Sequence, residues 1–152
     1  MKVIEELIKT KPIKDPYKRC FTNMIYNGSW FLNQITQVLK PFDITEPQFN
    51  VLRILRGAHG EPMNLYEVQN RMVQKMSNVS RLVDKLEEKG LVSRKECKDN
   101  RRRVELGITQ SGLDILEKIE NPFQKIFKSM AGALSKSEAE TLSALLDKIR
   151  YE

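Results

Sequence analysis

The sequence has few of the residues that most often carry catalysis or metal binding. It contains two cysteines, one histidine and one tryptophan among 152 residues. Cys20 and Cys97 form neither a CxxC metal motif nor a disulfide framework, so we predict a reducing, cytoplasmic setting. His59 lacks a metal-ligand spacing to either cysteine, and we therefore expect no metal site and no cofactor.

Other absences exclude further classes of protein. The longest apolar runs are far too short to cross a bilayer, and two glutamates interrupt the apolar N-terminal segment, which makes it a poor secretory signal. The sequence has no phosphate-binding glycine loop, no paired inward carboxylates and no nucleophile beside a base. We therefore expect neither a membrane protein nor an enzyme.

The positive charge is concentrated in one segment. The formal net charge is +6. Residues 71–103 contain 11 Lys/Arg and 5 Asp/Glu, whereas the rest of the chain contains 15 of each sign. A localised basic excess is typical of a surface that contacts phosphates. The alternative is a solvated basic face without a nucleic-acid partner.

Residues 77–90 predict an amphipathic helix at the centre of that segment. Val79, Val83 and Leu86 belong to a stripe with helical spacing. Ser77 is the predicted N-cap, and Gly90 stands where a left-handed C-terminal cap is favoured. The polar side of this helix supplies the candidates for reading DNA bases: Ser77, Asn78, Ser80, Arg81 and Lys85.

A two-stranded hairpin is predicted next, with its turn at residues 98–103. Val104, Leu106 and Ile108 alternate with other residues, the period of a half-buried strand. A polar-faced helix followed by a basic-tipped hairpin is the layout of a winged helix-turn-helix, in which the helix enters a major groove and the hairpin reaches the adjacent minor groove. The wing candidates are Asp99, Arg101, Arg102 and Arg103, and the candidates for phosphate contacts are Arg71, Lys75 and Lys98.

The remaining sequence predicts further helices with clear start signals. Asp15-Pro16 and Thr109 are predicted helix starts, and Asn121-Pro122 should kink or interrupt the helix that follows Thr109. Capping boxes stand at Thr45-x-x-Gln48, Asn64-x-x-Glu67 and Ser135-x-x-Glu138. The fold is thus mostly α with a small β-hairpin wing.

The two ends of the chain contribute amphipathic helices that lie outside the winged module. A homodimer interface would cover their apolar stripes, and packing within a single chain is the alternative. We expect N-terminal dimerisation helices at residues 1–40, the DNA-binding domain at 41–109 and C-terminal dimerisation helices at 110–152.

The pattern resembles the MarR family of bacterial transcription regulators. The carrying stretches are Ile44-Thr45-x-x-Gln48, NVSRLVDKLEEKGLVSR at residues 78–94, DNRRRV at 99–104 and Ile108-Thr109-x-x-Gly112. The resemblance implies a triangular homodimer that binds a palindromic operator in double-stranded DNA and usually represses nearby genes. In many members a small aromatic acid, a phenol or an oxidant relieves the repression.

Two departures from the family pattern stand out. Val73 occupies the position of a common turn glycine, and three arginines replace the usual Asp-x-Arg of the wing. Counting forward from Asp99 favours Arg101 as the minor-groove arginine, whereas counting back from Thr109 favours Arg102. Asp99 would orient that arginine, or it is an ordinary turn residue.

The sequence leaves alternatives open at three further sites. Arg81 is the leading candidate for a base contact; a phosphate contact or an ion pair with Asp84 or Glu88 is the alternative. Cys20 is a candidate redox sensor with Lys18 or Arg19 beside it, or a small buried hydrophobe. An effector pocket is predicted where the first long helix meets the Thr45 and Thr109 helices. Its aromatic candidates are Tyr26, Trp30, Phe31 and Phe49.

Three functions compete. The leading one is a homodimeric DNA-binding repressor that a small aromatic ligand releases. Alternatives are a redox-sensing regulator that uses Cys20 and a winged-helix module whose basic face binds an acidic protein partner.

Overall fold

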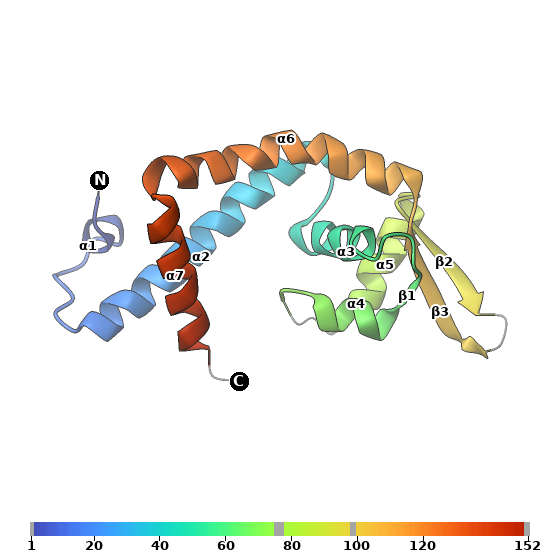
Figure 1. Ribbon diagram of the computed structural model, residues 1–152, viewed down its shortest axis with the longest axis horizontal. Coiled ribbons are helices and arrows are strands. Elements are labelled where there is room, and N and C mark those ends of the chain that lie inside the picture. The colour runs from blue at the N-terminus through green and yellow to red at the C-terminus, as the bar shows by residue number, and fades with distance from the viewer. Residues whose placement is uncertain (1, 75–77, 98–99, 151–152) are drawn as a thin grey trace.

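Two long helices carry a smaller lobe of helices and strands at one end of an elongated molecule (Figure 1). The computed structural model describes residues 2–74, 78–97 and 100–150. The predicted class, mostly α with a small wing, is confirmed. In chain order the elements are α1 (Ile4–Leu7), α2 (Pro16–Leu39), the short 3₁₀ helix η1 (Lys40–Phe42), α3 (Glu46–Arg56), β1 (Met63–Asn64), α4 (Leu65–Arg71), α5 (Val79–Glu88), β2 (Val92–Cys97), β3 (Asn100–Ile108), α6 (Gln110–Ala133) and α7 (Lys136–Ile149).

The lobe contains a three-stranded antiparallel sheet in the order β1-β3-β2. The sequence predicted only two strands and missed β1, in which Met63 pairs with Leu106. A two-residue strand has no alternating pattern to detect and is recognised only by its distant partner. The predicted turn was also too long, because β3 begins at Asn100 and residues 100–103 belong to that strand.

An apolar core joins the lobe to the adjoining ends of the two long helices. Val83 and Leu86 of α5 are fully buried, as is Leu52 of α3. Phe49 of α3 places its ring centroid 5.1 Å from that of Phe123 in α6. Burial of these side chains supplies the main driving force for folding, so the long helices and the lobe share one core at this end.

Local capping explains where most helices begin. The Thr45, Asn64 and Ser135 capping boxes form as predicted. Thr109 accepts a hydrogen bond from the Gly112 N–H, and Asp15 accepts from two N–H groups at the start of α2. The predicted N-cap of the reading helix was wrong by one residue: α5 begins at Val79 with Asn78 as its N-cap. Ser77 itself lies outside the described residues.

Helix α6 continues through Pro122, contrary to the predicted interruption. A proline inside a helix removes one backbone hydrogen bond and costs about 3 kcal/mol. Ile119 and Phe123 on either side of it are buried against the lobe. We attribute the continuity to this packing, which stabilises the helix on both sides of the proline.

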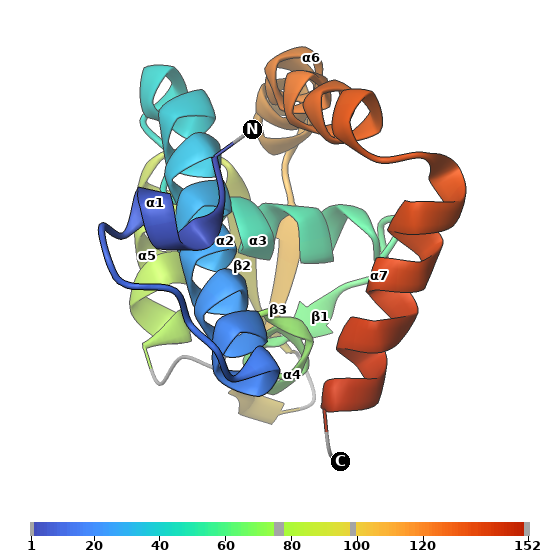
Figure 2. The ribbon, with the colours of Figure 1, turned by 90° about the vertical axis from the view of Figure 1, so that its left-hand side faces the viewer.

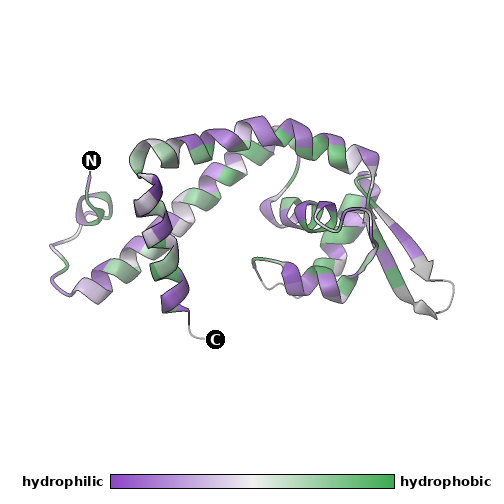
Figure 3. Cartoon of the chain, viewed as in Figure 1, coloured by the Kyte–Doolittle hydropathy of each residue, from purple (hydrophilic) through white to green (hydrophobic). Residues whose placement is uncertain are grey.

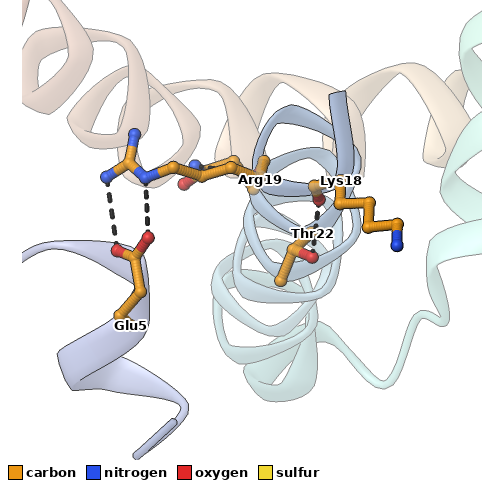
Figure 4. A network of polar contacts seen from close by, with 5 residues as sticks. Glu5, Lys18, Arg19 and Thr22 are labelled. Atoms are coloured by element: carbon orange, nitrogen blue, oxygen red, sulfur yellow. Dashed lines mark hydrogen bonds and ion pairs between the residues drawn. The ribbon is translucent and has the colours of Figure 1, made fainter. Parts of the chain in front are cut away.

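The two ends of the chain pack far less closely. Short α1 is attached to α2 by Arg19, whose Nε and Nη2 donate to the Glu5 carboxylate at 2.7 and 3.3 Å (Figure 4). The Arg19 hydrogen bond holds the pKa of Glu5 below its ordinary value. None of the residues of α7 is buried. Helix α7 crosses α2 in Figure 1, but Figure 2 shows the two helices well apart.

Candidate nucleic-acid interface

Helix α5 has one buried face and one face open to solvent. Its inner face consists of Val79, Val83 and Leu86, which are 2%, 0% and 0% exposed. The predicted reading residues Asn78, Ser80, Arg81 and Lys85 are all exposed. The structure therefore leaves these four side chains open to solvent, on a helix that lies in the same lobe as α4 and the wing (Figure 1).

Arg94 of β2 ties the reading helix to the sheet, a role that sequence reasoning missed. Its Nη2 lies 2.8 Å from the Asp84 carboxylate, and its Nε lies 3.8 Å from that of Glu87. Both acids belong to α5. Asp84 is therefore committed to Arg94, and among the described residues Arg81 has no ion-pair partner. This weakens the predicted alternative in which Arg81 pairs with Asp84.

The C-terminal end of α5 is fixed by a second set of contacts. Gly90 has a φ of +68°, and its N–H donates to the Glu87 carbonyl while the Leu91 N–H donates to that of Leu86. This pair of bonds is a Schellman motif, as the left-handed cap prediction requires. The Lys89 ammonium donates to both the backbone carbonyl and the carboxylate of Asp43. The reading helix is thus anchored at its middle and at its end.

The wing contains an irregularity where the three arginines lie. Val104 pairs with Glu96, but the next pair joins Asn100 to Cys97. Residues 101–103 fall between these two pairs, so the pairing register shifts there. Counting from Asp99 or from Thr109 therefore does not decide between Arg101 and Arg102, because the pairing is irregular between these two reference points. The side chains of Arg101, Arg102 and Arg103, and all of Asp99, lie outside the described part.

The phosphate candidates are only partly covered by the described residues. Arg71 is exposed at the last position of α4. Lys75 and Lys98 lie outside the described residues. The turn after α4 is held by the Val73 N–H, which donates to the Asn50 side chain of α3 at 3.0 Å. This contact places the helix-turn-helix corner without the glycine that the family pattern favours.

The four aromatic candidates for an effector pocket do not share one cavity. Trp30 lines a groove of about 340 Å³ between α2 and α6. The centroid of the Phe31 ring lies 4.9 Å from that of the Trp30 ring. Tyr26 lines a separate groove on α2. Phe49 lines a cavity of about 100 Å³ between α3 and α6, with Arg53 beside its ring. The structure therefore separates these residues into three places.

Cys20 is exposed on α2, so the alternative of a small buried hydrophobe does not hold in this chain. The neighbouring Arg19, a predicted source of positive charge, is engaged by Glu5. Within the described residues no group of His, Cys, Asp and Glu is placed to hold a metal ion. None of the described helices is long and apolar enough to span a membrane.

A helix-turn-helix whose second helix is exposed and polar, followed by a β-hairpin, defines a winged helix-turn-helix protein. Residues 44–104 match the family model described as "MarR family". The HTH-type transcriptional regulator MgrA of Staphylococcus aureus is 29% identical over 132 residues, which cover 86% of each chain. Over residues 44–104 the chain is thus similar to the MarR family, and over most of its length it is similar to a transcriptional regulator.

Solved structures of relatives have the same fold. The S. aureus MepR–DNA complex has a TM-score of 0.75 and 27% identity, covering 90% of this chain and 96% of that one. A MarR transcription factor from Planctomyces limnophilus has a TM-score of 0.69 and 26% identity, covering 90% and 98%. The winged-helix prediction is thereby confirmed.

Proposed function

We propose that this protein is a sequence-specific repressor that binds a palindromic operator as a homodimer. The observation that carries the proposal is the set of exposed polar side chains on α5, which includes Ser80, Arg81 and Lys85. The ion pair between Arg94 of β2 and Asp84 holds this helix against the sheet. Arginine can contact guanine with two hydrogen bonds, and lysine neutralises phosphates. The relative MepR was solved in complex with DNA, which supports a DNA-binding function for this fold.

The exposed apolar faces at the two ends support a homodimer. Helix α7 presents four large apolar side chains that its own chain does not bury (Figure 3). Helix α2 similarly exposes Phe21 and Ile25. Continuous apolar surface on several helices favours association, and a two-fold dimer would place two reading helices on successive turns of DNA. The four α7 side chains are Leu142, Leu145, Leu146 and Ile149.

In this proposal the predicted domain plan assigns residues 41–109 to DNA and residues 1–40 and 110–152 to dimerisation. A small aromatic effector would bind where these parts meet. The aromatic rings of Phe49, Phe123 and Phe127, with Arg53 over Phe49, support an aryl anion at this junction. The cavity of about 100 Å³ is smaller than usual ligand pockets, so binding there requires the helices to move apart or a second chain to enlarge the site.

The test is fluorescence anisotropy with a duplex from the region upstream of the protein's own gene. Wild type and Arg81→Ala are titrated with this duplex and with a scrambled one at several salt concentrations. We expect tight, salt-dependent binding to the specific duplex, which Arg81→Ala weakens by about 1–3 kcal/mol with loss of specificity. Lys128→Ala on the distant part of α6 is the matched control, because it also removes one exposed cation.

Three outcomes would change this proposal. An unchanged specificity in Arg81→Ala would show that the reading helix is assigned wrongly. Equal weak binding of wild type to both duplexes, together with a partner captured without DNA, would favour the protein-interaction alternative. Loss of operator binding on peroxide treatment that Cys20→Ser prevents would establish the redox alternative.

A further inference from the structure

A groove with a largely apolar floor and several polar side chains lies between the reading helix and the wing. Its volume is about 590 Å³, and it is bounded by the start of α4, the first turn of α5 and strands β2 and β3. Its polar side chains are Asn64, Tyr66, Ser80 and Arg94. The groove therefore joins the two elements proposed to enter the DNA grooves.

Two hydroxyl groups in this groove remain available for a ligand. The Asn64 side chain accepts from the Glu67 N–H at 2.9 Å, and Arg94 is paired with Asp84. Tyr66 is 71% exposed. Among the residues that the structure describes, neither Tyr66 nor Ser80 has a hydrogen-bond partner for its hydroxyl. Tyr66 belongs to α4, in which the sequence analysis named only Arg71 as a candidate for contacting DNA.

The geometry of DNA determines what crosses this groove. A major groove and its adjacent minor groove are separated by one sugar–phosphate strand. When α5 enters the first and the wing enters the second, that strand must pass between α5 and the sheet, over the groove. Phosphate oxygens accept hydrogen bonds from tyrosine and serine hydroxyls.

We propose that Tyr66 contacts DNA directly, and that its hydroxyl donates a hydrogen bond to a phosphate of this intervening strand. This inference rests on the proposed DNA-binding function. Because tyrosine carries no charge, the contact adds affinity without adding to the salt dependence, and because it touches the backbone, it adds nothing to base preference. Tyr66 thus differs from Arg81 in both measurable properties.

The experiment compares Tyr66→Phe with wild type in the anisotropy titration on specific and scrambled duplexes. This change removes only the hydroxyl of an exposed side chain, and a thermal melt checks that folding is unchanged. We expect about five- to tenfold weaker binding to both duplexes with the same salt slope.

A second arm locates the phosphate. Neutral methylphosphonates are introduced one at a time along the strand between the two grooves of the specific duplex. At one position the difference between wild type and Tyr66→Phe should vanish, because the acceptor of the hydrogen bond has been altered.

Wild-type affinity in Tyr66→Phe overturns the inference while leaving the regulator intact. A loss confined to the specific duplex also overturns it, since that result indicates a base contact. Failure of wild type to bind either duplex overturns the proposed function, and this inference with it.

Discussion

The helices of the winged lobe and those at the two ends of the chain have similar amphipathic patterns, but their apolar side chains are buried to very different extents. In the lobe, Val83 and Leu86 of α5 are completely buried. In α7, Leu145 belongs to an equally regular stripe and is 52% exposed. Figure 3 shows apolar positions along both parts of the chain. The periodicity thus predicts a helix with an apolar face, but not whether the same chain covers that face.

This difference in burial corresponds to a different role for each region in the proposed function. The lobe needs a fixed surface, and its single core holds α5 at a defined orientation. The ends need a surface that a second copy completes. We therefore expect substitutions in the lobe to change folding stability, and substitutions at the ends to change assembly.

The largest effect should come from a cavity in the lobe. Leu86→Ala removes three carbons from a fully buried site and should lower the free energy of unfolding by about 2–5 kcal/mol. Urea denaturation followed by circular dichroism measures the change. Val73→Ala, on an exposed residue of the same lobe, is the control and should change stability by less than about 0.5 kcal/mol. Equal stability of Leu86→Ala and wild type would contradict the packing of α5 described above.

A smaller effect, on dimerisation instead of folding, is expected when a charged residue is introduced on the apolar face of α7. Leu145→Glu places a carboxylate on the exposed apolar stripe and should weaken the proposed dimer about 10- to 100-fold. Sedimentation velocity over a concentration series measures this shift. Ser143→Glu adds the same charge about 200° around the helix and should leave the dimer unchanged. A dimer that tolerates Leu145→Glu would place the interface away from α7.

Much of the lobe could be predicted from sequence because its signals are local. The Thr45-x-x-Gln48 box and the Gly90 cap each depend on residues within one helical turn, and both form. The order of helix, turn, helix and hairpin follows from such signals. The family match to residues 44–104 covers the same region.

The missed features depend on contacts between distant residues. β1 exists only through its pairing with β3, and α6 passes through Pro122 next to side chains that are buried in the shared core. The anchoring of α5 by Arg94 joins residues that no local pattern links. The register shift at residues 101–103 lies between Asp99 and Thr109, the two positions from which the wing arginine was counted. In each case tertiary structure decides what local propensity leaves open.

The smallest expected effect tests an ion pair within the lobe. Asp43 follows η1 near the start of the part assigned to DNA binding, and its carboxylate lies 2.8 Å from the Lys89 ammonium at the end of α5. The Lys89 hydrogen bond holds the pKa of Asp43 below its ordinary value. A lowered folded-state pKa adds stability above the unfolded value of about 3.9, and this stability is lost as the pH falls through the folded-state pKa.

Asp43→Asn isolates this charge, because asparagine tolerates the left-handed backbone at this position and keeps the carbonyl that Lys89 also contacts. We expect the variant to be slightly less stable than wild type at pH 7, and the difference to shrink as the pH falls below about 3.9, by urea denaturation at each pH. The exposed pair is screened by salt, so 1 M NaCl should also remove the difference. A difference that persists at low pH and in 1 M NaCl would assign the effect to the backbone turn at Asp43 instead of its charge.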